Sequence, residues 1–136
     1  MMGAAAPLPG ATEVDPLYKA AFNRLSYVYD AAGDFDMALA TINKYISLAP
    51  EEPNPYDSRG DLYSSRGMLD EAIESYFQAL AIKPDFYFSR RKLGELYLFK
   101  RRFLQADSCF RELTTAADSA TRSSGRMYLG LAQMLQ

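Results

Sequence analysis

The stretch from Asn54 to Leu80, NPYDSRGDLYSSRGMLDEAIESYFQAL, decides the fold of this chain of 136 residues. In its first half, Tyr56, Gly60 and Tyr63 are four and three residues apart, a spacing that places them on one face of a helix. Its second half carries an apolar stripe with the same helical period, and a glycine separates the two halves. The stretch therefore predicts two antiparallel helices joined by a short turn.

The same pattern recurs along the chain at an interval of 34 residues. Taken from Lys19, three copies follow one another without a gap over residues 19–52, 53–86 and 87–120. The columns that recur are Ser26, Gly60 and Gly94; Tyr29, Tyr63 and Tyr97; Phe35, Leu69 and Phe103; Ala38, Ala72 and Ala106; and Ile42, Tyr76 and Phe110. Small columns let paired helices approach closely, so Ala72→Leu is expected to be damaging.

No alternation typical of strands is present, so the sequence predicts an all-α fold. Antiparallel helix pairs that repeat in this way stack into a right-handed alpha-alpha superhelix, a solenoid. Three helix pairs and a C-terminal helix are expected.

The two ends of the chain differ from the repeats. Residues 1–14 are rich in alanine, proline and glycine and are expected to form a flexible leader, so that the repeat domain covers residues 15–136. A terminal helix is expected over residues 121–136, where Gly130 takes the small position of a fourth first helix whose partner helix is missing. Because this helix is apolar on most sides, two explanations stay open. Either the chain is cut from a longer protein, or the helix binds another molecule or a second copy.

Several residues are typical of helix boundaries. Asp15 and Asn54 each precede a proline, which predicts an N-cap followed by proline in the first turn. Asp85 is expected to cap the helix that follows it. Gly33 and Gly67 stand between the two helices of the first and second copies and are expected to end the first helix of each pair.

The composition excludes several kinds of chemistry. Histidine is absent and Cys109 is the only cysteine, which excludes histidine-based catalysis, His/Cys metal sites and a disulfide framework. Asp34 and Asp36 lack the glycine and the final glutamate of a calcium loop and are expected to cap a helix instead. The sequence therefore predicts no catalytic residue, no metal site and no cofactor, and the chain is not expected to be an enzyme.

The same composition bears on location. One unpaired thiol fits a reducing compartment, so a cytoplasmic location is expected; Cys109 is expected to serve packing. No apolar run approaches the length that a membrane-spanning helix requires.

The repeat columns resemble those of the tetratricopeptide repeat (TPR) family. The second copy fits the family pattern best, with Tyr56, Gly60, Tyr63, Ala72, Tyr76, Ala79 and Pro84. Departures from the pattern are Ser26, Tyr45, Arg59, Arg90 and Asp118. The resemblance implies a non-catalytic scaffold for protein–protein interaction and a module of a larger protein. Residues 54–63 are also similar to repeats attached to bacterial signalling proteins.

The resemblance further implies a concave wall, built from four positions of each first helix, that binds a peptide or a partner protein. The residues at these positions are Ala20, Asn23, Tyr27 and Asp30; Asn54, Asp57, Asp61 and Ser64; and Phe88, Arg91, Glu95 and Leu98. Asp57 and Asp61 are expected to face a basic group of the partner. It stays open whether these helix faces are simply solvated and the binding surface lies elsewhere.

One known use of the family is not expected here. Members that bind chaperone C-terminal tails hold the terminal carboxylate with a clamp of lysine, asparagine and arginine side chains. The matching positions hold Asn23, Tyr27, Ser58, Phe88 and Lys92, and only Lys92 keeps the charge. Tight binding of such tails is therefore not predicted.

Charge is unevenly distributed, although 15 basic and 17 acidic residues leave a net charge of only −2. Residues 1–85 hold 6 basic and 13 acidic residues, whereas residues 86–136 hold 9 basic and 4 acidic ones. An alternative basic patch consists of Arg90, Arg91, Lys92, Lys100, Arg101 and Arg102. It would suit an acidic partner, a phosphate group or, less favoured, a nucleic acid. A head-to-tail contact between two copies is a further possibility.

Overall fold

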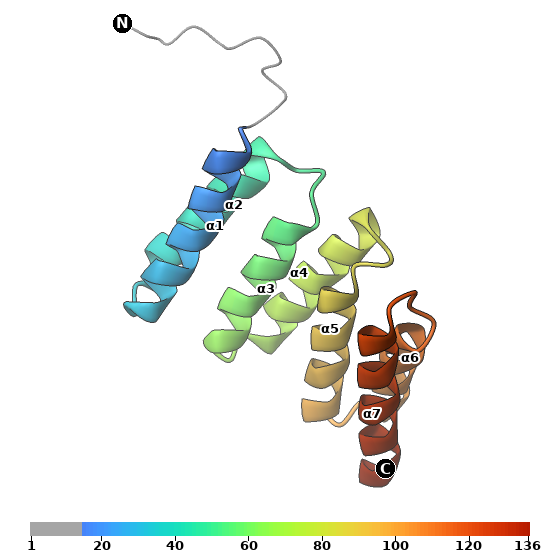
Figure 1. Ribbon diagram of the computed structural model, residues 1–136. Coiled ribbons are helices and arrows are strands. Elements are labelled where there is room, and N and C mark those ends of the chain that lie inside the picture. The colour runs from blue at the N-terminus through green and yellow to red at the C-terminus, as the bar shows by residue number, and fades with distance from the viewer. Residues whose placement is uncertain (1–14) are drawn as a thin grey trace, which may run out of the picture.

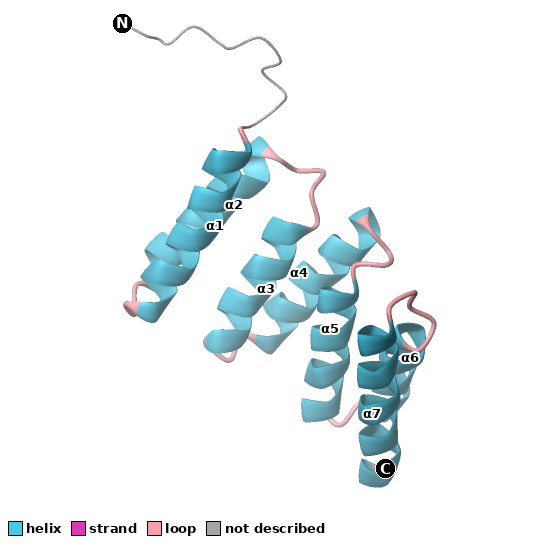
Figure 2. Ribbon diagram, viewed as in Figure 1, coloured by secondary structure: helices cyan, strands magenta, loops and turns pink. Residues whose placement is uncertain are grey.

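The computed structural model describes residues 15–136, and the leader expected over residues 1–14 lies outside them. The described part of the chain contains seven helices and no strand (Figure 2). In chain order they are α1 (Pro16–Ala31), α2 (Phe35–Leu48), α3 (Asn54–Ser65), α4 (Leu69–Ile82), α5 (Tyr87–Phe99), α6 (Phe103–Leu113) and α7 (Ser119–Leu135). The predicted all-α fold is confirmed.

The helices form three antiparallel pairs followed by one further helix (Figure 1). α1 packs on α2, α3 on α4 and α5 on α6, and each pair then packs on the next. α7 contacts α6 and also α5, as α3 contacts α2 and α1. α1, α3, α5 and α7 therefore form one side of a curved array, and α2, α4 and α6 form the other.

Close packing within a pair depends on a glycine in the first helix and an aromatic ring in the second. A methyl group added to Gly60 would overlap the ring of Tyr76, and one added to Gly94 would overlap the ring of Phe110. Both rings are buried, and the alanines of the same two helices, Ala72 beside Tyr76 and Ala106 beside Phe110, have no exposed surface. The structure thus gives the small columns the packing role that the sequence predicts.

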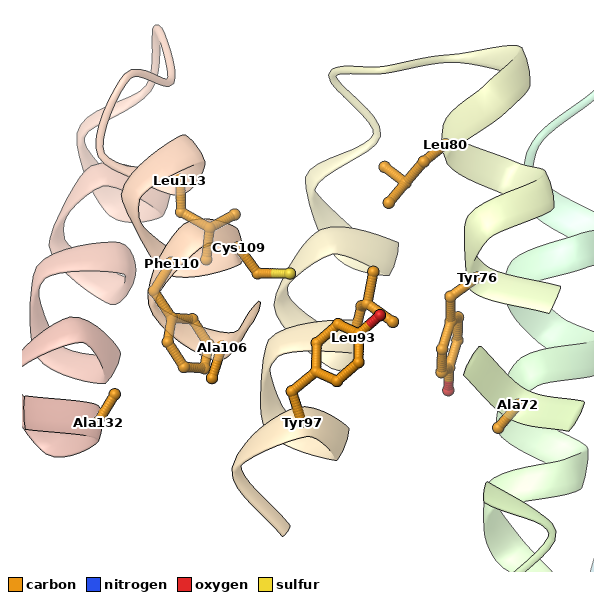
Figure 3. Close-up of a cluster of buried hydrophobic side chains, with 10 residues drawn as sticks. All are labelled: Ala72, Tyr76, Leu80, Leu93, Tyr97, Ala106, Cys109, Phe110, Leu113 and Ala132. Atoms are coloured by element: carbon orange, nitrogen blue, oxygen red, sulfur yellow. The ribbon is translucent and has the colours of Figure 1, made fainter. Parts of the chain in front are cut away.

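The core consists of two clusters of buried side chains, one that joins the first helix pair to Leu62 of α3 and one that runs from α4 to α7. Figure 3 shows the larger cluster, in which the rings of Tyr76, Tyr97 and Phe110 lie among smaller residues of neighbouring helices. Phe110 also stacks on Tyr128 of α7, with ring centroids 5.0 Å apart. α7 therefore extends the core and covers the end of the third pair.

Two of the predicted helix caps are confirmed. Asp15 Oδ1 accepts the backbone N–H of Leu17 at 2.8 Å, and Asp34 Oδ1 accepts that of Met37 at 3.2 Å. Each carboxylate satisfies an N–H group that has no partner within its helix.

The caps expected at Asn54 and Asp85 are wrong. α3 begins at Asn54 itself, so the N-cap position falls on Pro53, and α5 is preceded by Phe86 at that position. Neither Pro53 nor Phe86 provides a side-chain hydrogen bond to the helix. Asp118, which replaces the usual proline of the repeat, instead caps α7 by accepting the N–H of Thr121 at 2.7 Å.

The turn inside each helix pair has the same left-handed backbone conformation. Gly33 and Gly67 adopt φ angles of 83° and 72°, as expected for glycines that end a helix. Arg101 occupies the corresponding place in the third pair with a φ of 59°. A residue with a side chain is strained in this conformation, so the third turn is the least favourable of the three.

α7 begins at Ser119, two residues before the predicted start. Gly125 is buried in it, and a methyl group added there would lie 2.7 Å from Leu113 Cβ and 2.9 Å from the Thr114 nitrogen. Gly130 has no atom of the described residues near its missing side chain. In α3 and α5 the small position lies against the second helix of the same pair. The open space beside Gly130 agrees with its expected place at this position, because no second helix follows α7 in the described part of the chain. None of the helices over residues 15–136 is long and apolar enough to cross a membrane.

Candidate functional site

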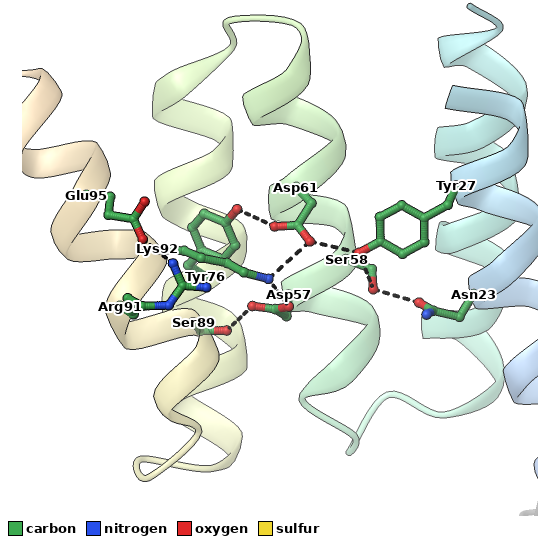
Figure 4. Close-up of polar contacts among 10 residues, drawn as sticks. All are labelled: Asn23, Tyr27, Asp57, Ser58, Asp61, Tyr76, Ser89, Arg91, Lys92 and Glu95. Atoms are coloured by element: carbon green, nitrogen blue, oxygen red, sulfur yellow. Dashed lines mark hydrogen bonds and ion pairs between the residues drawn. The ribbon is translucent and has the colours of Figure 1, made fainter. Parts of the chain in front are cut away.

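The first helices of the three pairs, together with Tyr76 of α4, carry a group of polar side chains that bond to one another (Figure 4). We call this group the central polar cluster; it consists of Asn23, Tyr27, Asp57, Ser58, Asp61, Tyr76, Ser89 and Lys92. Because α1, α3 and α5 all contribute, the cluster joins the three repeats.

Asp57 and Lys92 form the core of the central polar cluster. Asp57 is only 5% exposed, and its two carboxylate oxygens have separate partners. Ser89 Oγ donates to Oδ1 at 2.7 Å, and Lys92 Nζ donates to Oδ2 at 2.8 Å. Lys92 Nζ also donates to Asp61 Oδ2 at 3.1 Å. A buried carboxylate is thus compensated by a charge and by a hydrogen bond from the next repeat.

Two tyrosines complete the bonding of Asp61. Tyr76 Oη donates to Oδ1 and Tyr27 Oη to Oδ2, each at 2.7 Å. Burial, with a further contribution from the charge of Asp61, raises the pKa of both phenols above their ordinary value. Both phenols are therefore protonated donors at neutral pH, which fits hydrogen bonds to a carboxylate.

A third contact joins the first and second repeats. Ser58 Oγ donates to Asn23 Oδ1 at 2.6 Å, and Tyr27 Oη lies 3.4 Å from the same hydroxyl. Asn23 and Tyr27 are therefore held in position by α3.

The structure corrects the part expected of Asp57 and Asp61. On sequence alone, both carboxylates are expected to lie open toward a basic group of a partner. In the structure Lys92 of this same chain supplies that basic group, and Asp57 is buried beneath it. The reason is that neighbouring repeats place α3 and α5 side by side, so that charges on adjacent first helices meet.

A hollow of about 660 Å³ opens beside the cluster at the start of the array. We call it the N-terminal hollow, and it is lined by Lys19, Ala20, Asn23, Arg24, Tyr27, Tyr45, Glu52 and Asn54. Lys19 forms an ion pair with Glu52, whose Oε1 also accepts a hydrogen bond from Tyr45 Oη at 3.1 Å. The hollow therefore has a polar floor.

A second hollow, of about 470 Å³, lies between α5 and α7. We call it the C-terminal hollow, and it is lined by Lys83, Asp85, Phe86, Tyr87, Phe88, Arg91, Leu113, Asp118, Ala120, Thr121 and Ser124. Phe88 is 65% exposed and meets Phe86 edge to face, with ring centroids 5.7 Å apart. Aromatic and aliphatic side chains make this hollow more apolar than the first.

The structure brings most of the predicted wall residues to one of these three places. Asn23, Tyr27 and Asn54 line the N-terminal hollow, and Phe88 and Arg91 line the C-terminal hollow. The remaining four are Asp30, Ser64, Glu95 and Leu98. Asp30 Oδ1 accepts from Ser65 Oγ at 3.2 Å, and Glu95 pairs with Arg91. The Ser64 hydroxyl is buried, and Leu98 packs against the larger core cluster.

Sequence reasoning missed Lys19, Arg24, Tyr45 and Glu52 in the N-terminal hollow. Tyr45 was visible in the sequence as a departure from the small residue usual at its position. Its ring fills space that a smaller residue would leave open, and its hydroxyl reaches Glu52. Lys19 and Glu52 could not be placed from the repeat pattern, since Glu52 lies in the connection between two pairs.

Four of the six residues of the alternative basic patch are engaged within the chain, whereas Arg101 and Arg102 are exposed. Lys92 is engaged with Asp57 and Asp61, Lys100 with Asp70, and Arg91 with Glu95. Arg90 donates to the carbonyl oxygen of Pro84 at 3.0 Å. Ion pairs between the second and third repeats thus compensate part of the positive charge of the third repeat and part of the negative charge of the second.

Other reactive groups are few in the described part of the chain. Cys109 is buried, and burial raises the pKa of its thiol to about 11, which keeps it protonated at neutral pH. Over residues 15–136, no group of histidine, cysteine or carboxylate side chains is arranged to hold a metal ion.

Comparison with known proteins agrees with this architecture. Two family models match the chain, "Tetratricopeptide repeat" over residues 20–52 and "TPR repeat" over residues 60–98. The chain belongs to the tetratricopeptide repeat family. The matched TPR segments contain α1 to α5 in large part, and with them the central polar cluster except Asp57 and Ser58.

Among curated proteins, the TPR repeat-containing thioredoxin TTL4 of Arabidopsis thaliana is 31% identical to this TPR chain over 81 residues, which is 60% of this chain and 11% of that protein. The chain spans about a tenth of the length of the curated relatives it matches, between 7% and 12%.

Two solved structures show the same TPR fold. Pseudomonas aeruginosa pilF is 19% identical, with a TM-score of 0.76 over 87% of this chain and 53% of that one. The first TPR of Spaghetti (RPAP3), bound to the HSP90 peptide SRMEEVD, is 14% identical, with a TM-score of 0.72 over 89% of this chain and 94% of that one.

Proposed function

We propose that this TPR domain is a non-catalytic protein-interaction module that binds a peptide, or an exposed segment of a partner protein, on its concave wall. The observation that carries the proposal is that both hollows are lined by residues at the expected wall positions of first helices, Ala20, Asn23, Tyr27 and Asn54 in one and Phe88 and Arg91 in the other. Hollows of several hundred cubic ångströms accept side chains of a ligand, and exposed aromatic residues such as Phe88 supply contact area.

The central polar cluster supports this function by holding the wall in shape. Its carboxylates are paired within the chain, so the first helices of three repeats are linked before any partner arrives. A surface that is already ordered loses less conformational entropy on binding. We assign the cluster to positioning, and the two hollows to contact with the partner.

The structural neighbour bound to the HSP90 peptide supports peptide binding by this fold. The mode of binding must differ here. Lys92 is the one basic residue kept at the clamp positions, and its ammonium is bonded to Asp57 and Asp61. We therefore expect no saturable binding of the SRMEEVD peptide at micromolar concentration in a fluorescence titration.

The test of the proposal compares exposed residues on the two sides of the array. Ala20→Arg and Phe88→Glu each place a charge in one hollow, whereas Ala40→Arg and Leu104→Glu place the same charges on exposed positions of α2 and α6. Partners captured from a cell extract by the immobilised domain would be compared by mass spectrometry. We expect the first two variants to lose the captured partners and the matched pair to keep them.

The opposite pattern would contradict the proposal. If the two hollow variants retain the same partners as the unaltered domain while Ala40→Arg or Leu104→Glu loses them, the binding surface lies on the side of α2, α4 and α6. Circular dichroism of all four variants checks that they keep the helical fold.

A further inference from the structure

An exposed apolar stripe runs along α7. Met127, Leu131 and Met134 are 62%, 42% and 82% exposed, and their spacing of four and three residues places them on one face of the helix. The opposite face carries Gly125 and Ala132, which are buried against the rest of the array. We call Met127, Leu131 and Met134 the α7 stripe. Three large apolar side chains together on one exposed face form a patch rather than scattered exposure.

The α7 stripe continues the rim of the C-terminal hollow. Ser124 lies one turn before Met127 on the same side of α7, and it lines the hollow together with Phe88 and Arg91 of α5. A ligand that lies in the hollow and follows α7 therefore meets Met127, Leu131 and Met134 in order. The stripe and the hollow adjoin at the C-terminal end of the array, and their exposed large apolar residues are Phe88, Met127, Leu131 and Met134.

The charges along the α7 stripe are not balanced, although Asp85 and Asp118 offset Lys83 and Arg91 in the hollow. α7 contains Arg122 and Arg126 but no carboxylate. Arg122 is engaged, since its guanidinium donates to the carbonyl oxygens of Ala116 and Ala117 at 2.8 and 2.6 Å. Arg126 is exposed beside Met127, and its recorded contact is a long one to Ser123 Oγ at 3.4 Å. Arg126 is therefore available to a carboxylate from outside.

From these contacts we infer that the α7 stripe and the C-terminal hollow bind the apolar face of an acidic amphipathic helix from a partner protein. This inference rests on the proposed function and names the partner's chemistry at one end of the same wall. Two turns of a partner helix match the length of the stripe, and flexible methionine side chains adapt to the large residues of such a helix. A carboxylate at the edge of the partner's apolar face would pair with Arg126.

A second copy of this chain fits the surface less well. If two α7 helices met face to face, the arginines of both copies would approach, and α7 has no carboxylate with which to compensate them. A helix that brings its own negative charge therefore fits this surface better than a second α7 does.

The test uses the methyl groups of methionine in the whole chain, labelled with carbon-13, as probes in nuclear magnetic resonance. The ligand is a synthetic amphipathic peptide of about 18 residues, with leucine and phenylalanine on one face and glutamate on the other. We expect it to shift the signals of Met127 and Met134 in a saturable way. Met37 on α2 and Met68 in the turn between α3 and α4, which lie outside the stripe and the hollow, serve as internal references and should not move.

Matched variants separate the apolar from the charged contribution. Replacing both methionines, as Met127→Ser with Met134→Ser, should weaken binding at least about tenfold, whereas Met37→Ser should leave it unchanged. Arg126→Gln should weaken binding about threefold to tenfold, and the effect should fall as salt is added. A control peptide with lysine in place of glutamate should bind more weakly to the unaltered protein.

Four results would overturn the inference. The first is that the signals of Met127 and Met134 do not move, and the second is that the lysine peptide binds as tightly as the glutamate peptide. The third is that the stripe variants bind as tightly as the unaltered chain. The fourth is that the signals shift with protein concentration alone, which would identify a second copy as the occupant. The proposed function is judged separately. If Phe88→Glu and Ala20→Arg lose the natural partner while the stripe variants keep it, only the inference about α7 fails. If those two hollow variants keep the partner, the proposed function itself fails.

Discussion

Lys92 Nζ lies 2.8 Å from Asp57 Oδ2, so that the third repeat compensates a carboxylate buried in the second. Removal of the ammonium by Lys92→Ala leaves the charge of Asp57 buried with only Ser89 as a partner. We expect the free energy of unfolding to fall by about 2–3 kcal/mol, and Asp57→Asn in the same chain to restore part of the loss. Urea denaturation of the two single variants and the double variant measures this coupling.

Lys100→Ala is the matched control for this prediction. Lys100 also pairs with an aspartate of the second repeat, but Asp70 is exposed and loses little when its partner is removed. Equal destabilisation by Lys92→Ala and Lys100→Ala would mean that the buried pair has no special part in joining the repeats.

Gly60 should not tolerate even a methyl group, because the ring of Tyr76 occupies the space beside it. We expect Gly60→Ala to lower the stability by about 1–3 kcal/mol through overpacking, as measured by thermal or urea unfolding. Gly130→Ala should be neutral or stabilising by up to about 1 kcal/mol, since that position is open and alanine favours a helix. A neutral Gly60→Ala would refute the close approach of α3 and α4.

Arg101 should be replaceable by glycine with a gain in stability. Its φ of 59° is strained for a residue with a side chain, although its guanidinium lies 5.3 Å from the centre of the Phe103 ring. We expect Arg101→Gly to stabilise the chain by about 0.5–1 kcal/mol, after the loss of that contact. At the corresponding turn, Gly67→Ala should destabilise by about 1 kcal/mol. A melting temperature that falls in Arg101→Gly would show that the turn is not strained.

The stability of the chain should decline in alkaline solution. Burial and Asp61 raise the pKa of Tyr27 and Tyr76 in the folded state above the ordinary phenol value near 10. The unfolded chain therefore releases these protons first, and the stabilisation present below pH of about 10 is lost progressively as the pH rises further. Urea unfolding between neutral and alkaline pH measures the slope. The double variant Tyr27→Phe with Tyr76→Phe should show a shallower decline, and an unchanged slope would contradict the assignment.

The fold could be predicted from the sequence because one packing requirement acts on every repeat. The distance between paired helices is set by Gly60 and Gly94 against the rings of Tyr76 and Phe110, so the same residue types recur at the same interval. Turn glycines recur for an equally local reason, the left-handed backbone at Gly33 and Gly67.

The site could be predicted only in part, because polar pairing between repeats depends on how the helix pairs stack. The sequence pattern places Asp57, Asp61 and Lys92 on first helices, but it does not specify the relative position of α3 and α5. Lys92 is 35 residues from Asp57 and 31 from Asp61, and only the stacked array shows that it reaches both. Helix starts at Asn54 and Tyr87 were misplaced for a related reason, since tertiary packing outweighs the preference of a single capping residue.

The most direct test of the central claim, that partners bind on the concave wall, is photo-crosslinking from single positions. A photoreactive amino acid would replace Ala20 or Phe88 in the two hollows, or Ala40 or Leu104 on α2 and α6, and crosslinked partners would be identified by mass spectrometry. The account predicts that one partner is crosslinked from both hollows and from neither control position. A partner crosslinked from Ala40 or Leu104 but not from Ala20 or Phe88 would contradict it.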